Sequence, residues 1–169
     1  MSFYDTHVHK WHPPTRCHTS LGTWANAAGQ VANTIVHKKT ANLEDPVFTV
    51  PLELPMNDGD ARGAYLVSVD VYYELLVAAA TWLTAFIHRV TTPVNGAGIG
   101  AVEALAFTYD AASDAAGRVT ADQHSMTLSL TTPVWVEDDH VIQVVLAFTC
   151  GGAVVIDYIG IRANYSYRL

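Results

Sequence analysis

The stretch AYLVSVDVYYELL, residues 64–76, decides the fold class of this chain. Its apolar and aromatic side chains recur at every second position, so one face of an extended segment carries Tyr65, Val67, Val69, Val71, Tyr73 and Leu75. The opposite face carries Ser68, Asp70, Tyr72 and Glu74. A period of two is typical of a β-strand that buries one face. The stretch therefore predicts a long, half-buried strand.

The segment that follows allows two interpretations. YYELLVAAATWLTAFIHRV, residues 72–90, is rich in alanine and leucine, which are good helix formers. The alternative is a hairpin whose second strand is ATWLTAFIHRVTT, residues 80–92, where β-branched and aromatic residues favour a strand. The hairpin agrees better with the strand before it, and NGAGIG, residues 95–100, then predicts a loop.

Strand patterns also occur on both sides of this hairpin. They cover residues 31–37, 46–54, 102–110, 123–136, 140–150 and 153–169. In the last three, the apolar face is expected to hold His124, Met126, Leu128 and Leu130; Ile142, Val144, Leu146, Phe148 and Cys150; and Ile159, Ile161, Ala163, Tyr165 and Tyr167. About eight strands separated by turns predict an all-β fold, a jelly-roll-like antiparallel β-sandwich.

Length and composition limit the alternatives. The chain has 169 residues, 50% hydrophobic and 15% charged, which suits one folded domain. A (β/α)₈ barrel typically needs about 250 residues. No run approaches the ~18 apolar residues of a membrane span, and no signal-peptide pattern opens the chain, so we expect no membrane partner.

Charge divides the chain into two parts. Lys10, Arg16, Lys38 and Lys39 against Asp5 give residues 1–40 a charge of +3, so residues 41–169 carry −10 of the total −7. Residues 10–30 contain two prolines and two glycines and follow no regular period. We therefore expect an extended, basic, His-rich N-terminal arm at residues 1–44 and a sandwich domain at 45–169. The acidic body argues against a nucleic-acid partner.

The expected arm concentrates groups that could bind a metal or a protein. Imidazole and thiol ligands suited to zinc are supplied by His7, His9, His12, Cys17 and His18, although their spacing matches no common structural zinc site. We expect no cofactor, with structural zinc here as an alternative. Residues expected to contact a partner are Lys10, Trp11, Arg16, Trp24, Lys38 and Lys39. Two carboxylate pairs in polar turns, Asp58 with Asp60 and Asp138 with Asp139, are alternative calcium ligands.

The sequence DTHVH, residues 5–9, resembles the metal motif that opens amidohydrolases. That resemblance implies a metal-dependent hydrolase using Asp5, His7 and His9, with later ligands drawn from residues such as His88, His124, His140 and Asp157. No alternation of strands and helices is present to bring such residues to one barrel rim. We therefore interpret the motif as coincidental and expect no enzyme. Cys17 and Cys150 lack a CxxC spacing, and their redox state stays open.

The body has a further resemblance, carried by its order of segments. An arm, VPLELP (50–55), TTPVWVEDDHVIQVVLAF (131–148) and a final IDYIGIRANYSYRL (156–169) are similar to single jelly-roll domains of phage and viral structural proteins. The resemblance covers residues 45–169. It implies a homotrimer on the surface of a virion, decorating the capsid and gripping the major capsid protein or another virion protein through its arm.

Aromatic residues support a second function. Side chains that could stack on sugars in a carbohydrate-binding fibre or receptor-binding module are Tyr72, Trp82, Trp135, Tyr165 and Tyr167. The same residue types anchor protein interfaces. A glycan-binding module is therefore the first alternative to the capsid role, and the hydrolase is the second.

Overall fold

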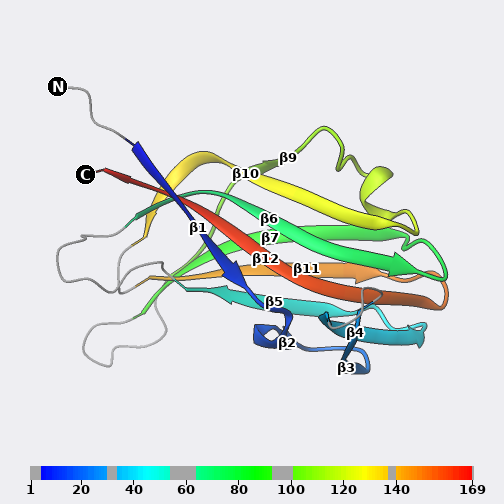
Figure 1. Ribbon diagram of the computed structural model, residues 1–169. Helices are drawn as coiled ribbons and strands as arrows, with labels where there is room; N and C mark the ends of the chain where they lie inside the picture. Colours follow the sequence, from blue (N-terminus) through cyan, green and yellow to red (C-terminus); the bar gives the residue numbers. More distant parts are fainter. Residues whose placement is uncertain (1–4, 30–33, 54–63, 93–100, 137–139, 169) are drawn as a thin grey trace.

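The structure, a computed structural model, describes residues 5–29, 34–53, 64–92, 101–136 and 140–168. These residues form two antiparallel sheets packed face to face (Figure 1). The fold is all-β, a jelly-roll-like sandwich, as the sequence predicts. No helix in the described ranges is long and apolar enough to cross a membrane.

The larger sheet has seven strands. Their order is β3 (Trp24–Ala28), β4 (Ile35–Asn42), β12 (Val154–Arg168), β6 (Ala64–Leu76), β10 (Gln123–Val136) and β9 (Phe107–Tyr109), and β1 (Asp5–His12) also pairs with β12. The smaller sheet runs β2 (His18–Thr19), β5 (Val47–Leu52), β11 (His140–Thr149), β7 (Trp82–Thr91) and β8 (Val102–Ala104). Two short 3₁₀ turns, η1 (Pro14–Arg16) and η2 (Gly117–Val119), complete the described elements.

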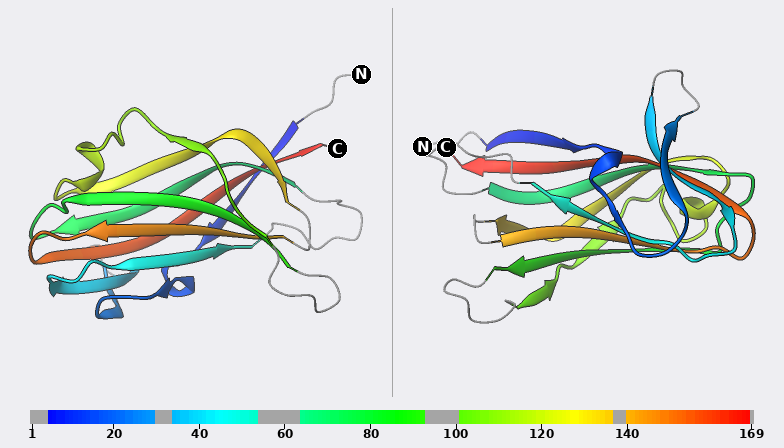
Figure 2. Two further views of the ribbon diagram at one scale, coloured as in Figure 1. Left: turned by 180° about the vertical axis from the view of Figure 1, so that it is seen from behind. Right: turned by 90° about the horizontal axis from the view of Figure 1, so that it is seen from below.

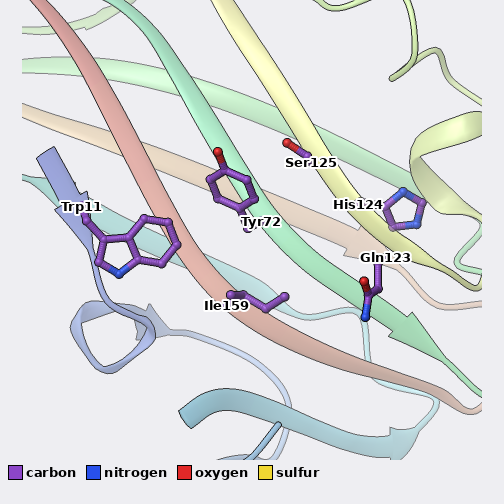
Figure 3. Close-up of a pocket in the computed structure, with 6 residues that line it drawn as sticks. All are labelled: Trp11, Tyr72, Gln123, His124, Ser125 and Ile159. Carbon is purple, nitrogen blue, oxygen red and sulfur yellow. The ribbon is translucent and has the colours of Figure 1, made fainter. Parts of the chain in front are cut away.

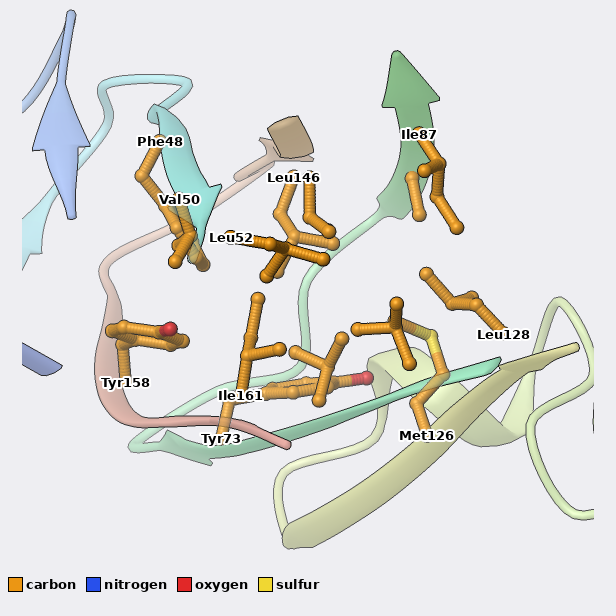
Figure 4. Packing of buried hydrophobic residues seen from close by; sticks show 14 of the residues in the cluster. Phe48, Val50, Leu52, Tyr73, Ile87, Met126, Leu128, Leu146, Tyr158 and Ile161 are labelled. Carbon is orange, nitrogen blue, oxygen red and sulfur yellow. The ribbon is translucent and has the colours of Figure 1, made fainter. Parts of the chain in front are cut away.

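The core fills the space between the two sheets. Alternate residues of β5, β7 and β11 point inward from the smaller sheet, and alternate residues of β6, β10 and β12 point inward from the larger one. Their apolar side chains interdigitate, with Phe48, Leu146 and Ile87 facing Tyr158, Tyr73 and Met126 (Figure 4). Fully burying a side chain of this size contributes about 1.5–3 kcal/mol each, so this layer holds the sheets together.

Strand β6 has the predicted bounds, but one part of its predicted face is wrong. Leu66 is buried while Tyr65 and Val67 are only half-buried, and from Val69 onward the odd-numbered residues are buried. Both neighbouring strands shift register next to Ser68. A β-bulge inserts one residue and reverses the alternation, which the sequence pattern did not reveal.

A second irregularity lies in β12. Its pairing with β6 shifts between Tyr158 and Gly160. Ile161, Ala163 and Tyr165 are buried as predicted, but Ile159 lines a pocket on the outside of the sheet. The residues on the core side before the shift are Ile156 and Tyr158.

The helix alternative for residues 72–90 is wrong, because β6 and β7 are both strands. The single strand predicted at residues 102–110 is two strands in different sheets. Strand β8 pairs with β7, and β9 pairs with β10. The chain crosses the sandwich between them, and Leu105 is buried at the crossing. Twelve strands are described, where about eight were expected.

The segment expected as an irregular arm lies in the sheets. Strand β1 pairs with β12 over eight residues, from Asp5 opposite Arg168 to His12 opposite Ile161. Strand β2 pairs with β5, and β4 pairs with both β3 and β12. Seen from below, β3 and β4 rise from the larger sheet on the side away from the smaller one (Figure 2, right). An unpaired long edge of β12 would be an aggregation hazard, and β1 covers it.

Candidate functional site

The outer face of the seven-stranded sheet carries a row of four side chains in register. Trp11 of β1 lies opposite Arg162 of β12, Arg162 opposite Asp70 of β6, and Asp70 opposite Thr127 of β10. Directly cross-strand side chains on one face have Cβ atoms about 4.5–5.5 Å apart. The register therefore brings together residues from four strands that are far apart in the sequence.

Asp70 is the centre of a hydrogen-bond network in this row. Its Oδ2 accepts from Arg162 Nε at 2.9 Å and from Asn164 Nδ2 at 3.0 Å, and its Oδ1 accepts from Thr127 Oγ1 at 2.7 Å. Arg162 Nη2 also lies 2.8 Å from Oδ2, which makes an ion pair. Asn164 Nδ2 donates to Ser68 Oγ at 2.8 Å. The network fixes the guanidinium and amide groups on the sheet face.

These contacts set the ionisation of Asp70, which is only 5% exposed. Burial favours the neutral acid, but the hydrogen bonds from Asn164, Thr127 and Arg162, with the charge of Arg162, outweigh it. The pKa of the Asp70 carboxyl is consequently below its ordinary value. Asp70 is therefore a fixed anion that orients Arg162, and its oxygens are already engaged by four donors.

Two aromatic rings lie beside the network. The rings of Trp11 and Tyr72 have centroids 5.5 Å apart and are inclined at 44°. Trp11 is 47% exposed. The Arg162 guanidinium carbon lies 6.0 Å from the centre of the Tyr72 ring, at the limit of a cation–π contact.

These rings border a pocket of about 320 Å³. Its lining comes from β1, β6, β10 and β12 and consists of Trp11, Tyr72, Gln123, His124, Ser125 and Ile159 (Figure 3). Trp11 and Ile159 lie on one side and the β10 residues on the other, with Tyr72 between them. Apolar rings with a few amide and hydroxyl groups are typical of a small-molecule site.

Gly160 allows Trp11 to lie where it does. Its φ is +147°, which L side chains rarely adopt, and a Cβ there would lie 2.8 Å from the His12 carbonyl oxygen and 2.9 Å from Trp11 Cη2. The indole therefore crosses the backbone at a position where only glycine leaves space. This glycine is at the register shift of β12, so the irregularity of the strand positions the aromatic ring.

The structure separates the residues expected to bind zinc. His7, His9 and Trp11 point outward from β1, whereas His12 is buried on its inner side. Cys17 Sγ donates to the Pro14 carbonyl at 3.1 Å, and His18 is exposed in the other sheet. No three His, Cys, Asp or Glu side chains in the described part of the chain are placed to share a metal.

Three of these residues have contacts within the protein that account for their positions without a metal. His9 Nδ1 lies 2.6 Å from Asn164 Oδ1, which joins it to the Asp70 network. Burial lowers the pKa of His12 to about 4, helped by the charges of Lys10 and Arg16. Burial raises the pKa of the Cys17 thiol to about 11. Cys17 and the buried Cys150 are both free thiols.

The residues with which the hydrolase alternative would bind a metal are dispersed. His88 and His140 lie on the smaller sheet, while His124 stacks on Tyr73 with centroids 4.8 Å apart and Nε2 2.8 Å from the Thr120 carbonyl. Asp157 pairs with Lys38. The side chain of Asp5 and the carboxylates of Asp58, Asp60, Asp138 and Asp139 lie outside the residues whose side chains are described.

Most residues expected to contact a partner are engaged within the chain. Lys10 and Arg16 both pair with Glu53, and Lys38 Nζ lies 3.3 Å from Asp157 Oδ2. Lys39 is fully buried and donates to the Val154 carbonyl. Three of these four basic residues therefore pair with acids of the same molecule.

The two tryptophans expected to anchor a partner lie in different environments. Trp24 stacks on His37, packs its edge on Phe48 and donates its Nε1–H to the Leu21 carbonyl. It is an anchor of the fold. Trp11 is in the candidate site described above.

The residues expected to stack on sugars are distributed over the whole molecule. Tyr72 is in the pocket, Tyr165 is buried, and Trp82 is exposed on the other sheet. Trp135 packs against Tyr65, and the side chain of Tyr167 is not among those described. Sequence reasoning missed Arg162, Asn164 and Gly160 as site residues. The alternation of polar residues on β12 was a signal, but only the register aligns it with Trp11.

No family model matches this chain, and no curated protein sequence does. Among solved structures, a family 11 carbohydrate-binding module from Clostridium thermocellum, in complex with a β-1,3-1,4-mixed-linked tetrasaccharide, is 8% identical. The match covers 92% of this chain and 94% of that one, with a TM-score of 0.42. A second structure, from work on carbohydrate-binding modules of the β-sandwich superfamily, is 8% identical with a TM-score of 0.39. That match covers 97% of this chain and 55% of the other.

Proposed function

We propose that this protein is a non-catalytic carbohydrate-binding domain that holds sugar rings on the outer face of its seven-stranded sheet. The observation that carries the proposal is the pair formed by exposed Trp11 and half-buried Tyr72, set beside the fixed Asp70–Arg162 network. Sugars have an apolar C–H face and a rim of hydroxyls. A site with both an aromatic surface and fixed polar groups suits that chemistry.

The two kinds of group have separate roles in this proposal. The aromatic faces of Trp11 and Tyr72 contact the apolar face of a sugar ring and exclude water from it. Gln123 and Ser125 supply hydrogen-bonding groups at the pocket wall. Arg162 supplies guanidinium donors at the rim, in an orientation set by Asp70. Groups that are already ordered before binding lose less conformational entropy when the ligand arrives.

Isothermal titration calorimetry with soluble neutral polysaccharides tests the proposal. We expect Trp11→Ala and Tyr72→Ala each to weaken binding at least about tenfold, as expected for an aromatic residue at the centre of a binding site. Trp82→Ala removes an equally exposed tryptophan from the opposite sheet and serves as the matched control. Undiminished binding by both site variants, or no binding to any glycan by the parent protein, would contradict the proposal.

The capsid-decoration role implied by the resemblance to viral structural proteins stays a prediction, as do the trimer and the virion location. Its mechanism needs revision, because the basic residues assigned to attachment pair with Glu53 and Asp157. Glycan binding is compatible with a surface module of a particle. It is the function that the geometry of the described residues supports better.

A further inference from the structure

The outward face of the five-stranded sheet carries no formal charge. Alternate residues of 47–51, 82–90, 102–104 and 141–149 point away from the core, since the residues between them are buried or face inward. None of the outward positions is Asp, Glu, Lys or Arg. The ion pair of Arg89 with Glu103 belongs to the intervening positions of β7 and β8, one residue out of step with the outward ones.

Large apolar groups stand out from this face. Trp82 is 54% exposed, Phe86 44% and Val102 61%. Phe86 lies opposite Val145, which in turn lies opposite Thr49, so the uncharged surface continues across three strands. His88 stacks on Phe86 with ring centroids 5.9 Å apart. The outer face of the other sheet differs, because it carries the ion pair of Arg162 with Asp70, and Arg162 is exposed.

We infer that this face is the contact between two copies of the chain in a homodimer. The chain carries a net charge of −7, so two copies repel each other wherever charged surfaces meet. A charge-free face is the part of the described surface on which two like-charged molecules can approach without burying a charge. A partner recognised by charge would find no group to pair with here.

The size of the face fits a small, specific interface. Strands lie about 4.8 Å apart and alternate residues about 6.8 Å apart, so each outward position covers about 33 Å², and the outward positions named above present roughly 500 Å². Two such faces bury about 1,000 Å² in total, which is near the minimum for a specific interface between two proteins. Two sheets can stack face to face in this way, as they do inside a sandwich. A contact of one face with itself closes at two copies, unlike the trimer implied by the viral resemblance.

Sedimentation equilibrium of the full chain over a series of concentrations tests the inference. The parent protein is expected to approach twice the 18.3 kDa chain mass as its concentration rises. Thr84→Glu places a charge in the middle of the face at a position that is already exposed and polar, so the core is untouched. We expect it to raise the dimer dissociation constant at least about tenfold, because each copy then buries an unpaired carboxylate.

The matched control is Thr131→Glu, the same substitution at an exposed position of β10 in the other sheet. It should leave the dimer dissociation constant unchanged. Phe86→Ser is a second test that adds no charge and removes a central apolar contact. A parent protein that stays monomeric at about 100 μM, a trimer, or a dimer equally weakened by the control would overturn the inference. A monomer in which the Trp82 signal changes on addition of a glycan would also overturn the inference, because the face would then bind sugar.

Discussion

Gly160 shows how one residue can determine the site. The Trp11 indole and the His12 carbonyl occupy the space that any side chain at this position would need, and the backbone φ of +147° favours glycine. The position of the indole in the candidate site therefore depends on a residue with no side chain. A sequence pattern alone gives no reason to connect position 160 with position 11.

Replacing Gly160 with alanine should displace Trp11 as well as strain the backbone. We expect Gly160→Ala to lower the free energy of unfolding by about 1–3 kcal/mol, the usual cost of an unfavourable φ. Glycan affinity should fall at least as far as it does in Trp11→Ala. Denaturant unfolding and calorimetry on the same sample measure the two effects, and retained affinity would mean that the ring position is not what binds.

His12 gives the protein a predictable pH dependence. Its pKa is lowered from 6.5 to about 4 in the folded state, so between these values the unfolded chain binds a proton that the folded chain does not. Stability is therefore lost progressively as pH falls from about 6.5 to about 4, by roughly 3 kcal/mol in total. Above pH 6.5 this residue contributes no pH dependence.

Urea unfolding at several pH values tests this expectation with His12→Gln, which does not titrate. The variant should lose less stability than the parent protein between pH 6.5 and 4.5. Parallel stability curves for the two proteins in this interval would show that His12 is not the responsible group. Asp70 affects a lower interval, because its pKa lies below the ordinary value near 3.8.

At the level of elements, the Asp70 network connects strands that do not all pair with one another. Through Arg162, Asn164 and Thr127, it joins β6 to β12 and β10, and His9 extends it to β1. Asp70→Asn keeps the shape of the side chain, but it replaces one acceptor oxygen with an NH₂ donor and removes the charge that pairs with Arg162. We expect it to lower the unfolding free energy at pH 7 by about 1–3 kcal/mol.

The stabilising effect of Asp70 is present above its unfolded pKa and is lost as pH falls through the lower folded value. The difference between the parent protein and Asp70→Asn should therefore shrink as pH falls below about 3.8. A difference that does not change with pH would show that the charge of Asp70 is irrelevant to stability. Thermal unfolding monitored by circular dichroism across this pH range is the measurement.

Strand β1 is the element that the sequence misrepresented most. Strand assignment worked where alternation was long, as in β6, β10 and β11, because one buried face imposes a period of two. It failed for β1 because its outward side carries His7, His9 and Trp11 and its inward side carries Lys10 and a buried histidine. Neither side is apolar, so the partner strand β12, and not hydrophobicity, determines its position.

The bulges explain the remaining errors at this scale. The register shifts at Ser68 and at Gly160 reverse which residues face the core. A shift of one residue moves every later side chain of the strand to the other face of the sheet. The local sequence pattern does not show where such a shift occurs. The candidate site depends on these registers, so its residue types could be proposed from sequence but their assembly could not.

Removing residues 1–12 should therefore affect the sandwich itself, and not only a detached arm. It exposes the edge of β12 from Ile161 onward and removes Trp11. We expect a protein that unfolds at lower denaturant concentration, aggregates more readily and has lost glycan binding. An equally stable, soluble truncated chain would support a detached arm. Chemical denaturation and light scattering of the two proteins decide between these results.

At the scale of the whole molecule, the two outer faces have different chemistry. The seven-stranded sheet presents aromatic rings with a fixed ion pair, and the five-stranded sheet presents an uncharged apolar surface. One face suits a sugar and the other a second copy. In a dimer joined through the smaller sheets, the two sugar sites would lie on opposite outer surfaces, so a single polymer or surface could be bound at two points.

The most direct test of the central claim uses the four tryptophans as internal reporters. A titration of the ¹⁵N-labelled protein with a soluble oligosaccharide would follow all four indole N–H resonances by NMR, with assignment from Trp11→Phe and Trp82→Phe. We predict that the Trp11 resonance moves with ligand concentration while that of Trp82 stays in place. A shift of the Trp82 resonance with an unchanged Trp11 resonance would place the sugar on the opposite sheet. That result would contradict the proposed site.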